Sequence, residues 1–277
     1  MKTTLLIGAL VCLTAQCGQT APLTESTFTE VIHVVNRLDD QGQPSPAKMN
    51  DLLKAPERVR TGPESRAELT AADHTITRVG ANTVFSFADS GRTLNLEQGS
   101  LLFHAPKGQG GGTIKSGGAS AAVLGTTLIV SATPTGGFKV VLLEGQGKLT
   151  LANGKTVTLQ AGQMVFVASN GTQFSDVLTI NLGKLVAGSN LVNGFAQPLA
   201  SRDLIAAAVA GQNQLLAKGS ATDTGRAPVN GLAAVDHGGY ETSAHPVMNK
   251  LQYTQVSNAA IGGGAGGRNF SSLDFFP

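Results

Sequence analysis

The sequence predicts a mainly β protein, and three observations support this fold class. Short runs of alternating apolar and polar residues recur through the middle of the chain, and Gly, Asn or Asp closes most of them. Glycine supplies 35 of the 277 residues, which suits frequent tight turns. Charged residues make up 14% of the chain, against about 25% in typical globular proteins. This composition excludes a highly charged disordered chain and a coiled coil.

The first 21 residues have the features of a secretory signal peptide. Lys2 precedes an apolar run over residues 5 to about 13, and small residues follow. A membrane-spanning helix needs about 20 apolar residues, and no segment approaches that length. We therefore expect an exported protein, periplasmic or secreted to the cell surface, with no transmembrane span in the mature chain.

Both cysteines lie in or beside this first segment. Removal of the segment would leave neither a disulfide nor a thiol nucleophile in the mature chain. Attachment of a lipid at Cys17 needs a small residue immediately before it, and Gln16 is not small. The sequence therefore argues against a lipid anchor.

Residues 22–56 are expected to form a lead-in segment. Its apolar residues at 28–35 fit either a short helix or a strand, because periodicity does not separate the two. The stretch QGQPSPAK at 41–48 is expected to be a turn or linker, since it places two prolines in a polar setting.

Residues 57–168 are expected to form the β body. The alternating runs predict strands at 65–69, 75–79, 84–87, 93–96, 101–104, 138–143, 148–151, 156–159 and 164–167. In the run at 84–87, Phe85 and Phe87 fall on one face. Asn153-Gly154 separates two runs and predicts a two-residue hairpin in which both residues have positive φ.

One short pattern occurs three times in this body. A leucine, a glycine three residues later and a further apolar residue appear at 96–101 and 159–164, and the first half recurs at 142–145. In each copy a strand ends, the chain turns at glycine and another strand begins. The spacing is too irregular for a strict repeat array, yet it fits a stacked or wound all-β body.

Residues 169–218 are expected to form a helical extension. Ser201 is placed to cap a helix over 202–218, a stretch rich in Ala and Leu. Residues 219–277 contain few bulky apolar side chains, and we expect a low-complexity, disordered tail.

The sequence contains no complete motif for a cofactor, a metal or a nucleic acid. Gly154-Lys155-Thr156 resembles the end of a phosphate loop, but Leu149 occupies the position of the required first glycine. The five histidines are scattered without ligand spacing: His33, His74, His104, His237 and His245. The net charge of +2 gives polyanion binding no electrostatic driver. We therefore expect no cofactor, no metal and no nucleic-acid partner.

No catalytic nucleophile stands out, because the sequence lacks a Gly-x-Ser-x-Gly elbow. Several carboxylates lie in or beside predicted strands, where an exposed strand face or a turn explains them: Glu64, Glu68, Asp73, Glu97 and Glu144. Trp is absent, and both tyrosines lie outside the β body. Because sugar sites commonly use aromatic faces, this argues against a sugar-binding site.

Six blocks in the β body occur in the order found in one known domain family. They are VRTGPESRAEL at 59–69, RVGANT at 78–83, LNLEQG at 94–99, LGTT at 124–127, LEG at 143–145 and LQAGQ at 159–163, with Asp73 between the first two. Over about residues 57–168 the chain resembles a FecR domain, the periplasmic domain of bacterial iron-uptake signalling regulators. The resemblance implies an all-β body that is either a wound β-solenoid or sandwich-like.

The motif residues are expected to have structural roles, with glycines between strands and no catalytic group among them. They are Arg60, Thr61, Gly62, Ser65, Arg66, Glu68, Leu69, Gly80, Asn82, Thr83, Gly99, Gly125, Thr126, Glu144, Gly145, Gly162 and Gln163. The charged side chains Arg60, Arg66, Glu68 and Arg78 are expected on exposed strand faces.

The resemblance implies a non-catalytic sensing or interaction module with a protein or cell-envelope partner. Regulators of the family control a sigma factor through a cytoplasmic segment, but a signal peptide occupies that place here. We therefore expect a stand-alone exported version that makes contact through edge strands and loops. Two alternatives are a structural component of the envelope or extracellular matrix and a polysaccharide hydrolase that uses paired carboxylates.

Overall fold

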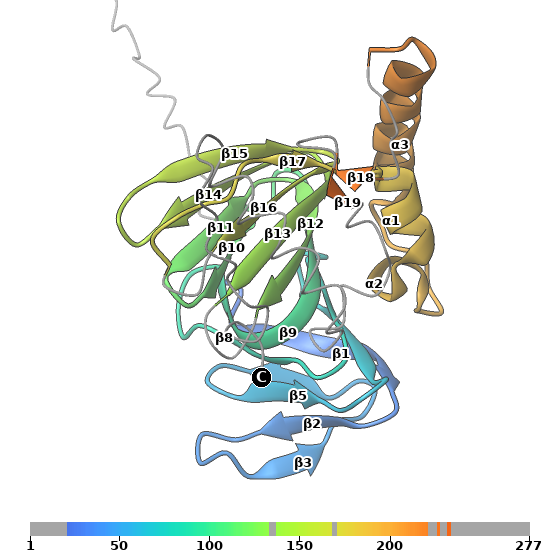
Figure 1. The fold of residues 1–277 in the computed structure, drawn as a ribbon. Helices are drawn as coiled ribbons and strands as arrows, with labels where there is room; N and C mark the ends of the chain where they lie inside the picture. Colours follow the sequence, from blue (N-terminus) through green and yellow to red (C-terminus); the bar gives the residue numbers. More distant parts are fainter. Residues whose placement is uncertain (1–20, 133–136, 168–170, 221–225, 228–231, 234–277) are drawn as a thin grey trace, which may run out of the picture.

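The computed structural model describes residues 21–132, 137–167, 171–220, 226–227 and 232–233 (Figure 1). The expected signal peptide, both cysteines and nearly all of the expected tail lie outside the described residues. The described part is mainly β, as the sequence predicts.

The strands belong to two sheets that share β9. The first half of the chain contributes β1 (Glu25–Ile32), β2 (Val35–Leu38), β3 (Pro44–Pro46), β4 (Leu52–Lys54), β5 (Arg58–Thr61), β6 (Arg66–Thr70), β7 (Ile76–Val79), β8 (Val84–Phe87) and β9 (Thr93–Ala105). The second half contributes β10 (Gly112–Ser116), β11 (Ala119–Val123), β12 (Thr126–Ala132), β13 (Phe138–Glu144), β14 (Gln146–Leu151), β15 (Thr156–Gln160), β16 (Gln163–Val167) and β17 (Leu178–Thr179). Two further short strands, β18 (Arg226–Ala227) and β19 (Leu232–Ala233), pair only with each other.

One sheet has the strand order β4-β1-β6-β7-β9-β12-β13-β16-β17, and we call it the helix-side sheet. The other has the order β3-β2-β5-β8-β9-β10-β11-β14-β15, and we call it the open sheet. All of these pairings are antiparallel except that of β9 with β10. The chain places successive hairpins alternately in the two sheets, so the body is sandwich-like.

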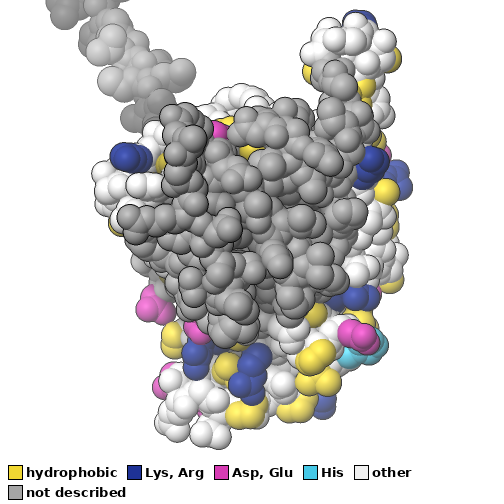
Figure 2. Space-filling model, in the orientation of Figure 1, with side chains coloured by type: hydrophobic (Ala, Val, Ile, Leu, Met, Phe, Trp, Pro, Cys, Tyr) yellow, Lys and Arg dark blue, Asp and Glu magenta, His cyan; other side chains and the backbone are white. Residues whose placement is uncertain are grey.

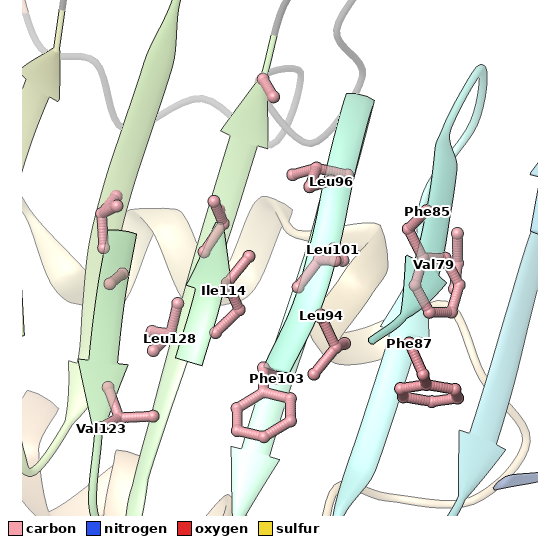
Figure 3. Close-up of a cluster of buried hydrophobic side chains, with 14 of the residues drawn as sticks. Val79, Phe85, Phe87, Leu94, Leu96, Leu101, Phe103, Ile114, Val123 and Leu128 are labelled. Atoms are coloured by element: carbon pink, nitrogen blue, oxygen red, sulfur yellow. The ribbon is translucent and has the colours of Figure 1, made fainter. Parts of the chain in front are cut away.

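The two sheets face each other across a common apolar core. Figure 3 shows side chains from both sheets in this core, among them Phe85 and Phe87 of the open sheet and Leu101 and Leu128 of the helix-side sheet. Phe85 and Phe87 meet edge to face with ring centroids 5.7 Å apart. Their predicted position on one buried face is confirmed.

The repeated leucine–glycine pattern marks the places where the chain passes from one sheet to the other. Gly99 lies inside β9, where residues before it pair with β8 and residues after it pair with β12. Gly145 lies between β13 and β14, and Gly162 between β15 and β16. Gly99 has a φ of +90°, and a Cβ there would collide with Thr83. Gly145 has a φ of +79°, and a Cβ there would lie 2.8 Å from Thr126 Oγ1.

Three helices cover the outer face of the helix-side sheet: α1 (Leu182–Gly188), α2 (Asn190–Asn193) and α3 (Arg202–Ala217) (Figure 1). A second apolar cluster fills this interface. Sheet residues Leu102, Ile129, Val141 and Met164 pack there with helix residues Leu182, Leu185, Leu191 and Ile205. The helix predicted to follow Ser201 is α3.

The segment expected as a lead-in contributes four strands. The choice between helix and strand at residues 28–35 is settled as strand, since β1 pairs with both β4 and β6. The two strands predicted at 93–96 and 101–104 are one strand, β9. Strands β5, β10, β11 and β12 were not predicted, and the stretch 41–48, expected to be a turn or linker, contains β3.

The predicted hairpin at Asn153-Gly154 lies in the right place but has a different turn. Gly154 has a φ of +82°, whereas Asn153 is not among the residues with positive φ. The amide of Gly154 donates to Leu151 O at 2.9 Å, and Asn153 Oδ1 accepts from the amide of Lys155 at 3.1 Å. The loop therefore needs only one left-handed residue, because the Asn153 side chain supports the turn.

Gly99→Ala should destabilise the protein more than Gly91→Ala, which is its matched control. Both glycines have positive φ, but no atom lies within 4 Å of a Cβ built at Gly91. We expect a loss of about 1–2 kcal/mol of unfolding free energy at position 91 from backbone strain alone. Overpacking against Thr83 should add roughly 1–3 kcal/mol at position 99. Urea unfolding followed by circular dichroism measures both, and equal losses would contradict the crossover geometry.

Candidate functional site

The motif residues are spread along the crossovers between the sheets. In the first half of the chain, β5 ends with Arg60 and Thr61, the next turn contains Gly62 and Ser65, and β6 contains Arg66, Glu68 and Leu69. The connection from β7 to β8 contains Gly80, Asn82 and Thr83, and β9 contains Gly99. In the second half, Gly125 and Thr126 lie at the start of β12, Glu144 and Gly145 at the end of β13, and Gly162 and Gln163 at the start of β16. Three of them, Arg66, Gly80 and Asn82, line one pocket, and the others lie outside it.

Hydroxyl groups bind the backbone at these crossovers. Thr61 Oγ1 donates to Gly80 O at 2.6 Å and accepts from the amide of Thr83 at 2.9 Å. Thr83 Oγ1 in turn accepts from the amide of Ser100 at 2.9 Å. Ser65 Oγ accepts from the amide of Val34 at 3.0 Å. The crossovers are thus linked to one another through side chains.

Arg78 and Glu68 form a buried ion pair, which corrects the expectation that both lie on exposed strand faces. Arg78 is 0% and Glu68 is 7% exposed. Arg78 Nε lies 2.8 Å from Glu68 Oε2, and Glu68 Oε1 accepts from Thr29 Oγ1 at 2.8 Å. Both residues point to the helices from the outer face of the helix-side sheet. A buried charge needs such partners, since it is costly without them.

The remaining donors of Arg78 hold the chain after α2. Nη1 lies 2.7 Å from Val192 O and 3.2 Å from Leu191 O, and Nη2 donates to Gln197 O at 2.6 Å. The guanidinium carbon also lies 4.5 Å from the centroid of the Phe195 ring. Arg78 therefore fastens the segment around α2 to the sheet.

A second polar cluster lies beneath the start of α3. His104 Nδ1 lies 2.9 Å from Thr127 Oγ1, which donates to Glu144 Oε1 at 2.7 Å and lies 2.7 Å from Ser201 Oγ. Exposed fractions are 6% for His104, 0% for Thr127, 4% for Glu144 and 1% for Ser201. The expectation of an exposed surface for Glu144 is therefore wrong, and Ser201 contacts Thr127 and makes no side-chain capping bond.

Burial shifts both titratable groups of this cluster toward their neutral forms. It lowers the pKa of His104 below 6.5. It also raises the pKa of Glu144 above 4.5, although the hydrogen bond from Thr127 and the charge of Lys107 oppose the shift. A serine, a histidine and a carboxylate are components of nucleophilic sites, but here Thr127 separates them and all are shielded from solvent. As placed, the cluster joins β9, β12 and β13 to α3.

The other candidate carboxylates have different surroundings. Asp73 lies 2.7 Å from Arg92 Nη2, and its Oδ1 accepts from the amide of Thr75 at 2.9 Å. Burial raises the pKa of Asp73, but the bonds to Thr75 and the charge of Arg92 outweigh it and hold the pKa below 3.8. Glu64 and Glu97 are exposed, as expected. The observed hydrogen bonds and ion pairs of these carboxylates go to Thr, Arg and backbone groups and to no second carboxylate in the described part of the chain.

In the described part of the chain, no group of three His, Cys, Asp or Glu residues is placed to hold a metal ion. No helix in that part combines the length and apolar character needed to cross a bilayer. In Figure 2, basic and acidic side chains both appear on the coloured part of the face shown.

The open sheet has one long edge with free backbone groups. Lys155 O accepts from the amide of Leu151 at 2.9 Å, and the register places Val157 opposite Leu149. Because bonded and non-bonded positions alternate, the amides and carbonyls of Thr156 and Thr158 point away from β14. Gln163 Oε1 accepts from the outward amide of Gln160 at 2.8 Å. No described strand pairs with this side of β15.

The other sheet edges are short or blocked. The opposite edge of the open sheet is β3, in which Pro44 and Pro46 flank Ser45. The edges of the helix-side sheet are β4, with three residues, and β17, with two. Proline and short length both protect an edge from pairing. β15 is thus the five-residue edge in the described part that is most open to another strand.

Arg78→Met should destabilise the protein far more than Arg58→Met. The first substitution leaves Glu68 buried without its cation and three carbonyls without their donor, and we expect a loss of about 3–5 kcal/mol. Arg58 lies 3.5 Å from Glu97 with both side chains well exposed, so its loss should cost under about 1 kcal/mol. Urea unfolding measures both, and similar losses would contradict the role of Arg78.

Acidification should destabilise the wild type more than the His104→Gln variant. Because the folded pKa of His104 lies below the unfolded value of 6.5, its contribution is fully present above 6.5 and is lost as pH falls through the folded pKa. The raised pKa of Glu144 has the opposite effect on the free energy of unfolding, which it increases as pH falls. Because Glu144 is present in both proteins, the difference between wild type and variant reports mainly on His104. Urea unfolding at pH values from about 7.5 to about 5.5 tests this, and parallel curves would refute it.

Comparison with known proteins identifies one family. The model of the family described as FecR protein matches residues 57–148, which confirms the resemblance over that range. Two crystal structures of a candidate anti-sigma factor from Parabacteroides distasonis ATCC 8503, at 1.65 and 2.50 Å resolution, are 16% identical with a TM-score of 0.38. Each alignment covers 42% of this chain and 57% of the other, so the similarity extends over little more than half of that protein. No curated protein matches the chain. The family similarity therefore lies in residues 57–148 of this chain.

Proposed function

We propose that this protein is a non-catalytic, exported FecR-domain module that binds a protein partner of the cell envelope by strand addition at β15. The free outward edge of β15 is the observation that carries this proposal. An extended segment of a partner gains main-chain hydrogen bonds when it joins such an edge. The uncharged sequence Thr-Val-Thr-Leu-Gln places no like charges in the way of an incoming strand.

The closed polar clusters support a binding role over catalysis. Arg78, Glu68, His104 and Glu144 are buried and are bonded to neighbouring protein groups. Polysaccharide hydrolysis through paired carboxylates has less support, because no observed hydrogen bond joins two of the candidates. The motif residues are proposed to be structural, since several of them bind the backbone at crossovers.

Export is proposed from the signal-like first 21 residues, which would place the protein in the periplasm or at the cell surface. The proposed division is a signal peptide at 1–21, a lead-in at 22–56, the β body at 57–168, a helical extension at 169–218 and a tail at 219–277. The lead-in belongs to the same sheets as the body, so the two would act as one folded unit. In this proposal, the protein senses its partner by binding a strand of that partner at β15.

Thr158→Pro should abolish partner binding, whereas Thr158→Val should preserve it. The amide of Thr158 points outward, so proline removes a donor from the free edge without taking a bond from β14. Valine changes the side chain and leaves the edge intact. A photo-crosslinking residue at position 156 in intact cells should capture one protein, which mass spectrometry identifies. The yield of this crosslinked product should fall at least about tenfold in the Thr158→Pro variant.

The same crosslinker at Lys115, which lies in β10 inside the open sheet, is the positional control. It should give little of the product obtained from position 156. Capture that survives Thr158→Pro, or the absence of any crosslinked protein, would overturn strand addition at this edge.

A further inference from the structure

A pocket of about 470 Å³ lies away from β15, where the helical segment meets two crossovers. We call it the Arg66 pocket. Its polar lining comes from His33 after β1, Glu64 and Arg66 around the start of β6, Asn82 after β7, and Asn190 at the start of α2. Pockets of this size are suited to small ligands or single side chains.

Three residues around the pocket have a left-handed backbone conformation. His33, Glu64 and Asn82 have φ values of 59°, 54° and 52°, in the left-handed region that non-glycine residues seldom adopt. They are three of the five such residues in the described part of the chain, and all three line this pocket. Strained residues of this kind concentrate at binding sites, where the surrounding fold holds them in place.

Arg66 lies in the pocket without a hydrogen-bonding partner among the described residues. Its Nε is buried and unbonded, and a Cβ built on Gly194 would lie 3.1 Å from that atom. The guanidinium of Arg78, by comparison, donates hydrogen bonds to one carboxylate and three carbonyls. No described hydrogen bond occupies the guanidinium of Arg66, and the side chain lines the pocket, so its donors are available to an acceptor that enters there.

The chemistry of the lining favours one kind of acceptor. A guanidinium presents a planar fork of donors that matches a carboxylate. Asn82 and Asn190 can supply further donors from their side-chain amides. The carboxylate of Glu64 partly offsets the single cation, which disfavours a phosphate with two negative charges.

We propose that the Arg66 pocket binds a singly charged carboxylate group through the Arg66 guanidinium. The group belongs either to a small organic acid or to an acidic side chain of a protein, since the chemistry is common to both. This site is separate from the β15 edge, so each can fail without the other.

The test uses matched acid and amide probes on the full chain. Glutarate and glutaramide differ in charge but hardly in shape, and capped Gly-Gly-Asp-Gly-Gly and Gly-Gly-Asn-Gly-Gly peptides differ in the same way. Titration followed by NMR should shift the backbone amides of Ala81 and Leu191 saturably with the acids and not with the amides. Binding of glutarate identifies a small-acid site, and binding of the Asp peptide alone identifies a protein side chain.

Variants separate a ligand site from a structural one. Arg66→Gln should weaken binding of the acid at least tenfold, and Arg66→Lys should weaken it less. Arg60→Gln, an exposed arginine on the open sheet, is the matched control and should bind normally. Thr158→Pro should also bind normally. Arg66→Met should unfold at no lower urea concentration than wild type, because Arg66 has no partner to lose.

Three results would overturn the proposal. They are equal shifts with the acid and amide probes, undiminished binding by Arg66→Gln, and no saturable shift with either acid. A marked loss of stability in Arg66→Met would also count against it, since that would show a structural role for the guanidinium.

Discussion

The Arg78 guanidinium is the constraint on which the arrangement of the other parts depends. It is fully buried, so every donor must find an acceptor inside the protein, and it finds them on Glu68 and on the chain after α2. Glu30 adds a bond from the amide of Ala196 at 2.9 Å. The same stretch places Gly194 against Arg66. One buried cation thereby fixes the helical segment and, through it, the wall of a pocket around a second cation that has no partner.

The alternating winding explains why the two sheets have such different outer faces. Each crossover sends the next hairpin into the opposite sheet, so both sheets grow together around one core. The helix-side sheet then has apolar residues such as Leu102 and Ile129 on its outer face, and the helices cover them. The open sheet has exposed or half-exposed Lys115, Lys148 and Thr158 there, which need no cover. A partner that binds the open sheet would therefore contact backbone groups at its edge and polar side chains on its outer face, and it would bury little apolar surface.

Local periodicity predicted much of the β body but not its tertiary contacts. β8 alternates between buried and partly buried residues and β13 is a run of bulky apolar residues, and both strands were predicted. β11 has the sequence Ala-Ser-Ala-Ala-Val, which is too small in side chains to show a pattern. Arg78 looked like a strand-surface residue because its acceptors on Leu191 and Val192 lie 113 and 114 positions away. No local pattern carries that information, and the same holds for a pocket assembled from residues 33, 64–66, 82 and 190.

The region that matches the family model contains only part of the Arg66 pocket and does not include β15. Residues 57–148 contain Glu64, Arg66 and Asn82, but His33 and Asn190 of the pocket come from outside that range. β15 also lies beyond it, and β6 would be an unpaired edge without β1. Flanking segments thus complete the sheets on one side and create binding features on the other. In this chain the crossovers set the scaffold, and the flanking segments set which side chains lie beside it for recognition.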